Sequence, residues 1–366
     1  MQATARFSGH CTVYSSAIKP SFFSPISTRL PRPHPPPFLS YRPISLQIRP
    51  LSATMRSNSS SFSDPAIKLP GSEPCLRAVI AGMEKVYFSR NPTAQSILDL
   101  VRSHDGDHVF YDHVAFRTFG VDGHGIDSIA KFFLDFGYVQ RDELRFPAKK
   151  LKALWFSPPQ AEHCDAEPLP RVFISELLVD EMSPRSQEII RKYTQLSGGG
   201  YKHAALASTL GCLTWGKPLY SDYELLSRES EYAAWTLVNG YALNHVTIST
   251  HRLKSEIRDI NSLNRFLEDQ GFKLNSDGGV LKVSPDGLLL QSSTVADSTS
   301  FTFADGVTES VPCCYIEFAE RLLLPQYTNL AHEEIKEFHR RDGFEVGNAD
   351  KIFESTSKEQ LTRKAT

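Results

Sequence analysis

The chain has 366 residues and a formal net charge of −2 at pH 7, because 40 Lys and Arg residues nearly balance 42 Asp and Glu residues. This balance favours neither nucleic acid nor an anionic membrane surface as a partner, and no stretch is apolar over the roughly 18 residues that a membrane-spanning helix requires. The six cysteines include no CxxC pair, which argues against a zinc ribbon or a redox dithiol.

The amino-terminal segment differs in composition from the rest of the chain. It contains no Asp or Glu before Asp64, while Arg and Lys are scattered among Ser, Thr and Pro, as is typical of a transit peptide. The proline-rich run at 31–37 excludes a regular helix, which favours a chloroplast-type over a mitochondrial signal. We therefore expect residues 1–60 to be a transit or disordered segment directing the protein to the plastid stroma; a disordered tail without a targeting role is the alternative.

Two later segments repeat one order of features. Each begins with a β-rich run containing His-Val, continues with a helical pattern that ends at a glycine followed by an aromatic residue, and reaches a late strand containing Glu. The first repeat is YDHVAFRTF at 111–119, GIDSIAKFFLDFGY at 125–138 and RVFISELLV at 171–179; the second is YALNHVTIST at 241–250, EIRDINSLNRFLEDQGF at 256–272 and CCYIEFAER at 313–321. The chain is therefore predicted to be α+β, with a duplicated strand–helix–strands unit.

The repeats suggest the domain organisation. We expect one catalytic domain over residues 70–355, with modules at about 108–180 and 238–322. A helical insertion should occupy about 183–237, and a carboxyl-terminal helical cap about 328–355, including a helix at 331–344 that covers a pocket. Residues 356–366 are polar and are expected to form a flexible tail.

Strand alternation places the candidate functional side chains. His113 and Arg117 share one face of the first strand, while Asp112 should point to the other. His245 lies in the equivalent strand of the second repeat, and Glu317 lies between Ile and Phe in a late strand, where an unpaired carboxylate would be costly. Two imidazoles and one carboxylate form a facial set suited to ferrous iron and dioxygen.

Simpler interpretations of these residues stay open at this point. Each histidine can be a hydrogen-bonded core residue, and Arg117 can be an ordinary ion-pair residue. Glu176, which we take as the internal counterpart of Glu317, can be a fourth ligand, a partner of a ligand or an ion-paired strand residue. We favour the last two.

Three motifs carry a family resemblance: DHVAFRTFG with His113 and Arg117, LNHVTIST with His245, and YIEFAER with Glu317. Over residues 75 to 355 the chain resembles the 2-oxoadipate dioxygenase/decarboxylase family, also called hydroxyglutarate synthases, and in particular its plant plastid members. The resemblance implies a vicinal-oxygen-chelate fold of paired βαβββ modules. It also implies Fe(II) bound by His113, His245 and Glu317. It further implies that His113 and Arg117 bind the substrate and that Arg117 is a catalytic residue.

The same resemblance implies the reaction. A 2-oxo acid and O2 would be the small-molecule partners, and 2-oxoadipate would be converted to 2-hydroxyglutarate and CO2 during lysine catabolism. Two alternatives remain: a non-oxidative metalloenzyme of the same fold, resembling glyoxalases or isomerases, and a non-catalytic plastid scaffold that affects starch and endosperm development.

Overall fold

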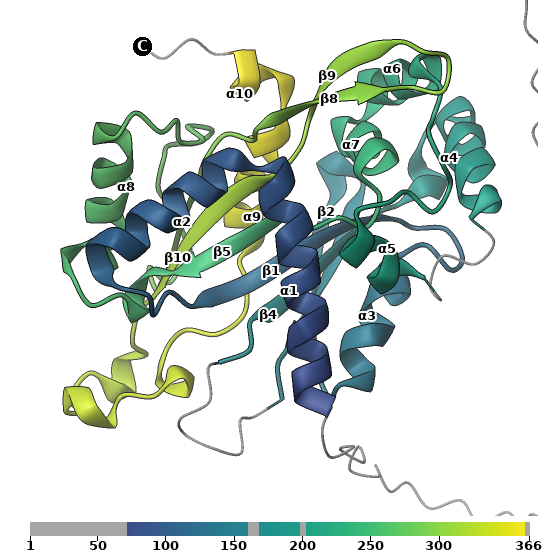
Figure 1. The fold of residues 1–366 in the computed structure, drawn as a ribbon. Helices are drawn as coiled ribbons and strands as arrows, with labels where there is room; N and C mark the ends of the chain where they lie inside the picture. Colours follow the sequence, from purple (N-terminus) through teal and green to yellow (C-terminus); the bar gives the residue numbers. More distant parts are fainter. Residues whose placement is uncertain (1–71, 160–167, 198–202, 363–366) are drawn as a thin grey trace, which may run out of the picture. The chain divides into compact units, whose positions relative to one another are not determined.

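An eight-stranded sheet lies at the centre of the computed structural model, which describes residues 72–159, 168–197 and 203–362 (Figure 1). The predicted transit segment lies outside the described residues. In sheet order the strands are β2 (Val139–Phe146), β3 (Leu151–Ser157), β4 (Arg171–Leu177), β1 (Tyr111–Phe119), β5 (His245–Ser249), β10 (Tyr315–Arg321), β7 (Leu289–Ser293) and β6 (Lys282–Val283). A separate hairpin pairs β8 (Ser298–Thr302) with β9 (Thr308–Pro312).

The sheet has two halves with the same connectivity. One runs β1-α3-β2-β3-β4, where α3 is Ile126–Asp135, and the other runs β5-α8-β6-β7-β10, where α8 is Ile260–Asp269. In each half the first strand lies parallel to the last, and the halves meet where β1 pairs antiparallel with β5. These are the predicted paired βαβββ modules, so the predicted α+β fold class is confirmed.

The two module helices end in the same way. Gly137 follows α3 with φ of +86° and Gly271 follows α8 with φ of +85°, a left-handed conformation that residues with a Cβ rarely adopt. These are the two glycines that the sequence pattern placed at the helix ends.

Glu176 corresponds to Glu320 rather than to Glu317, which corrects the expected pairing of the repeats. Glu176 accepts a hydrogen bond from the backbone N–H of Ile126 at the start of α3, and Glu320 does the same for Ile260 at the start of α8. Glu176 also pairs with Lys152 at 2.9 Å. Carboxylates stabilise helix N-termini because these carry unpaired N–H groups and the positive end of the helix dipole.

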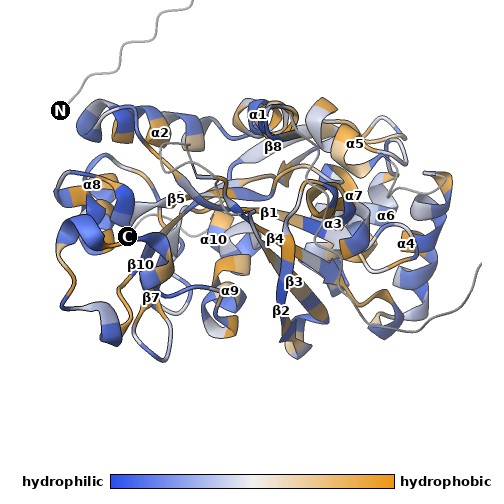
Figure 2. Cartoon of the chain, turned by 90° about the horizontal axis from the view of Figure 1, so that it is seen from below, coloured by the Kyte–Doolittle hydropathy of each residue, from blue (hydrophilic) through white to orange (hydrophobic). Residues whose placement is uncertain are grey.

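Helices cover the sheet on both sides. Hydrophobic residues gather along β1, β4 and α7, whereas the outer faces of α2 and α8 are largely hydrophilic (Figure 2). Outside the modules the longer helices are α1 (Ser72–Arg90), α2 (Pro92–Asp105), α4 (Pro184–Leu196), α5 (Ala204–Leu210), α6 (Tyr220–Glu229) and α7 (Glu231–Asn239). Among the residues that the structure describes, no helix is long and apolar enough to cross a membrane.

The helix expected at 331–344 is absent. The segment forms only the short 3₁₀ turns His332–Glu334 and Glu337–His339. Its backbone instead pairs with the chain that follows β10, since Leu324 N–H donates to His339 and Arg341 N–H donates to Leu322. Such tertiary pairing overrides a local helical preference.

The expected flexible tail is also wrong for residues 356–362. The chain continues from α9 (Val346–Ile352) through the 3₁₀ helix η9 (Phe353–Thr356) into α10 (Lys358–Thr362). Thr356 and Gln360 are buried, with exposed fractions of 4% and 3%. Polar side chains here are internal because they bond to other parts of the fold.

Candidate metal centre

Three side chains from neighbouring strands meet at one point: His113 of β1, His245 of β5 and Glu317 of β10. β5 lies between the other two strands, and its Thr247 is the register partner of both His113 and Glu317. His245 Nε2 lies 3.3 Å from His113 Nε2 and 3.1 Å from Glu317 Oε2. All three side chains are buried.

Each of these groups also has a polar partner that holds its other ring nitrogen or carboxylate oxygen. The contacts are Asp112 Oδ1 with His113 Nδ1 at 2.8 Å, Asn244 Oδ1 with His245 Nδ1 at 3.0 Å, and Gln291 Nε2 with Glu317 Oε1 at 2.6 Å. Partners of this kind orient metal ligands and set the histidine tautomer.

The Nε2 atoms of His113 and His245 and the Oε2 atom of Glu317 form a donor set for a metal ion. The candidate ligand atoms of His113, His245 and Glu317 all lie within 4.8 Å of one another. Three buried donors, each oriented by a second contact, leave coordination positions on one side open, as a catalytic metal requires. The residues therefore fit a divalent transition metal.

Electrostatics inside the cluster favour an ionised carboxylate. Burial alone would raise the pKa of Glu317, but His113 and His245 outweigh burial and lower that pKa to about 2. Burial lowers the pKa of His245, which favours the neutral imidazole needed for metal binding. Glu317 and Asp112 in turn raise the pKa of His113 against the effect of burial, so in the metal-free cluster the charged oxygen of Glu317 is paired mainly with His113.

A small cavity adjoins these ligands and is mainly apolar. Its walls come from β4, from β10 and from the segment after residue 343. Besides the three candidate ligands, the lining residues are Phe173, Gln291, Tyr315, Phe344, Ala349, Ile352 and Phe353. The Phe344 ring stands edge-on to His113, with ring centroids 4.8 Å apart. The carboxyl-terminal segment therefore covers the cluster and limits the access of water.

Arg117 lies on the same face of β1 as His113 and is buried. Its Nη1 donates to Thr356 Oγ1 at 3.0 Å, and its guanidinium packs over the rings of Tyr232 and Trp235, with centroids 5.1 and 5.0 Å away. Burial lowers the pKa of Arg117, and no carboxylate in the described part of the chain forms an ion pair with it. A buried cation without an anion suits an anionic ligand.

Arg117 and Tyr315 both present unused hydrogen-bonding atoms. Arg117 Nε and the Tyr315 hydroxyl are buried and have no hydrogen bond of normal geometry among the described residues, although the Tyr315 hydroxyl lies close to the Arg117 guanidinium. The Tyr315 ring stacks on His245 at 4.7 Å. Buried donors without partners are rare in proteins, and a ligand carboxylate would satisfy them.

The structure brings His113, His245 and Glu317 together and places Arg117 on the same face of β1 as His113, whereas Glu176 accepts a hydrogen bond at the start of α3. It also adds Asp112, Asn244, Gln291, Tyr315, Thr356 and the aromatic residues of the cover. One signal for two of them was present in the sequence: each candidate histidine ligand directly follows an Asp or Asn residue. The others come from segments whose contacts with the site no local pattern indicates.

Comparisons with known proteins agree with this site. A family model described as 2-oxoadipate dioxygenase/decarboxylase matches residues 79–337. A chloroplastic/amyloplastic 2-oxoadipate dioxygenase/decarboxylase from Oryza sativa subsp. japonica is 71% identical over 306 residues, covering 82% of this chain and 84% of that protein. A chloroplastic relative of the same name from Arabidopsis thaliana is 67% identical over 297 residues, covering 80% of each.

Solved structures are similar as well. The crystal structure of the Oryza sativa hydroxyglutarate synthase in complex with 2-oxoadipate aligns with a TM-score of 0.80 and 70% identity, covering 84% of this chain and 100% of that one. A glyoxalase superfamily protein from Ralstonia eutropha aligns at 0.56 with 21% identity, covering 78% of this chain and 92% of that one, which supports the fold alone. The resemblance inferred from the three motifs is confirmed.

Proposed function

Because this chain belongs to the 2-oxoadipate dioxygenase/decarboxylase family, we propose that it converts 2-oxoadipate and O2 to 2-hydroxyglutarate and CO2. The observation that carries the proposal is the convergence of His113, His245 and Glu317 in a chain 70% identical to a hydroxyglutarate synthase crystallised with 2-oxoadipate. Both oxygen atoms of O2 are accounted for in the two products.

His113, His245 and Glu317 are the proposed ligands of Fe(II). Two histidines and one carboxylate with open positions are the ligand set typical of non-haem iron oxygenases. When bound, the iron supplies the activation of O2 and the redox chemistry that protein side chains cannot perform. Gln291 keeps the Glu317 carboxylate oriented through its 2.6 Å hydrogen bond.

Arg117 is the proposed substrate-binding residue. The substrate has two carboxylates, and the buried guanidinium has no anionic partner among the described residues. A planar guanidinium binds a carboxylate through paired hydrogen bonds, and its aromatic neighbours hold it in place. The unpaired hydroxyl of Tyr315 lies on the cavity wall and can donate to the same ligand.

The apolar cover supports this chemistry. Phe173, Phe344 and Phe353 line the cavity, so a bound 2-oxo acid would displace water from the ligands. Exclusion of water strengthens the electrostatic interactions of Arg117 with substrate and protects reactive species from side reactions.

The proposed location is the plastid stroma. Two relatives are named as chloroplastic or chloroplastic/amyloplastic proteins, and the amino-terminal segment here has the composition of a transit peptide.

Oxygen uptake by the iron-loaded protein tests the proposal. We expect O2 consumption on addition of 2-oxoadipate, with 2-hydroxyglutarate identified by mass spectrometry. His245→Ala should abolish both, whereas His332→Ala, which alters an exposed histidine, should change neither. Iron binding without O2 uptake would contradict the oxidative reaction and favour a non-oxidative metalloenzyme; absence of metal binding would favour the scaffold.

A further inference from the structure

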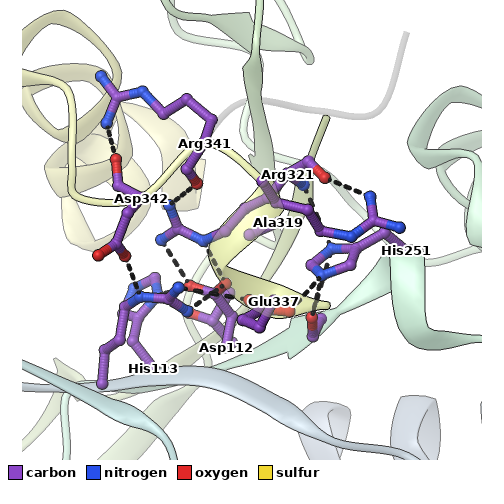
Figure 3. A network of polar contacts seen from close by, with 12 residues as sticks. Asp112, His113, His251, Ala319, Arg321, Glu337, Arg341 and Asp342 are labelled. Carbon is purple, nitrogen blue, oxygen red and sulfur yellow. Dashed lines mark hydrogen bonds and ion pairs between the residues drawn. The ribbon is translucent and has the colours of Figure 1, made fainter. Parts of the chain in front are cut away.

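Asp112 is a fully buried carboxylate that connects the candidate ligand His113 to two arginines (Figure 3). Its Oδ1 accepts from His113 Nδ1 at 2.8 Å and from Arg321 Nη2 at 2.9 Å, and its Oδ2 accepts from Arg321 Nε at 2.5 Å. Arg171 Nη1 donates to the same Oδ2 at 3.3 Å. Every contact of this carboxylate is thus with a nitrogen that can donate.

A β-bulge places Asp112 beside His113. The register of β1 against β5 shifts between Tyr111 and His113, so that Tyr111 faces Ile248 and His113 faces Thr247. Asp112 is the extra residue on β1. A regular strand would point its side chain away from the His113 ring, as the sequence alternation predicted, whereas a bulge redirects the side chain.

Arg321 fixes the carboxylate from the strand that carries another candidate ligand. It lies four residues after Glu317 on β10, on the same face, and none of its side chain is exposed. Its Nη1 donates to the carbonyls of Gly343 at 2.8 Å and Arg341 at 3.1 Å, while its guanidinium lies over the Phe344 ring. Arg321 therefore links Asp112 to the cover of the cavity as well.

The two candidate histidine ligands have different partners. His113 faces a carboxylate bound by two arginines, whereas His245 faces the amide oxygen of Asn244 at 3.0 Å. Because Asp112 Oδ1 accepts from Arg321 and lies against His113 Nδ1, the ring of His113 is held with its Nε2 facing His245 and Glu317.

We infer that Asp112 is a positioning residue for His113, which selects the tautomer and ring orientation that aim Nε2 at the metal, and that Arg321 holds Asp112 in this role. The inference rests on the metal site of the proposed function. Acceptors of this kind contribute to metal affinity, and their loss typically weakens binding about 10- to 100-fold.

Binding of Co(II) to the metal-free full-length protein tests the inference by calorimetry and by the visible absorption spectrum of Co(II). Asp112→Asn should weaken Co(II) binding about 10- to 100-fold and change the spectrum. Glu320→Gln is the matched control, because Glu320 lies on β10 next to Arg321 but caps α8 instead, and it should bind Co(II) like the unaltered protein. Equal affinities for Asp112→Asn and the unaltered protein would overturn the inference.

If Asp112→Asn shows no cooperative thermal transition and is therefore not folded, two milder variants test the inference. Arg171→Gln removes one cation from Asp112, whereas Asp342→Asn changes only one of the two outer carboxylate partners of Arg171, at 2.8 Å. Arg171→Gln should weaken Co(II) binding several-fold relative to Asp342→Asn, and equal affinities would overturn the inference. If the unaltered protein bound no Co(II), the proposed metal site itself would be wrong. Equal Co(II) affinities of the variants would instead overturn only the role given to Asp112.

Discussion

The guanidinium of Arg117 donates a 3.0 Å hydrogen bond to the hydroxyl of Thr356, although 239 positions separate the two residues in the chain. This contact attaches η9, whose Phe353 lines the metal cavity, to β1. The orientation of the proposed substrate-binding arginine therefore depends on a segment far from it in sequence.

Thr356→Val should impair substrate binding more than turnover. The substitution keeps the shape of the side chain but leaves Arg117 Nη1 without its hydroxyl partner, at a cost of about 1.5–3 kcal/mol in the free energy of unfolding. We expect KM for 2-oxoadipate to rise at least several-fold. Steady-state kinetics check this, with Thr362→Val as the control, since Thr362 is exposed and bonds only within α10. An unchanged KM would contradict the role given to this contact.

Tyr315→Phe should affect the enzyme only when substrate is present. The hydroxyl is buried without a hydrogen-bond partner in the described structure, so its removal should leave the free energy of unfolding nearly unchanged. Loss of one hydrogen bond to substrate should raise KM roughly 3- to 10-fold, corresponding to about 1 kcal/mol. Denaturant unfolding and kinetics measure the two effects, and Tyr327→Phe, outside the cavity lining, serves as the comparison. A marked loss of stability with unaltered KM would refute this prediction.

Metal binding should stabilise the fold, and removal of metal should reverse the effect. A ligand that binds only the folded state at 100 times its Kd stabilises it by about 2.7 kcal/mol, which raises Tm. Thermal unfolding with and without Fe(II) under anaerobic conditions measures the shift. Glu317→Gln should eliminate it, while Glu320→Gln should keep it, because Glu320 bonds to the start of α8 and not to the cluster. A persistent shift in Glu317→Gln would exclude Glu317 as a ligand.

Glu229 should contribute to stability at neutral pH and not in strong acid. Burial opposes its ionisation, but hydrogen bonds from Ser183, Ser186 and Lys150 lower its pKa to about 2 in the folded state, against 4.5 ordinarily. A lowered carboxyl pKa adds stability above pH 4.5, and this contribution is lost as the pH falls toward 2. Glu229→Gln should therefore lower the free energy of unfolding by only about 1 kcal/mol at pH 7, because water screens this exposed carboxylate, with the difference shrinking below pH 4.5. Urea unfolding across this pH range, with the exposed Glu188→Gln as the control, gives the measurement; a difference independent of pH would contradict it.

The amino-acid sequence by itself determined the duplicated βαβββ organisation and the residues that converge on the site. Both depend on local regularities, since alternation along a strand assigns faces and a glycine with positive φ ends each module helix. Three motifs then led to the family, and with it to His113, His245, Glu317 and Arg117.

Only the tertiary structure decided what surrounds these residues. A bulge, which arises from strand pairing, turned Asp112 toward His113, against the alternation expected of a regular strand. The helices that Glu176 and Glu320 cap showed that these two residues correspond in the repeats. The segment 356–362 is held against the fold by contacts such as those of Thr356 with Arg117 and of Gln360 with Lys273. These contacts join residues distant in sequence, and their free energy exists only once the strands and the carboxyl-terminal segment have come together.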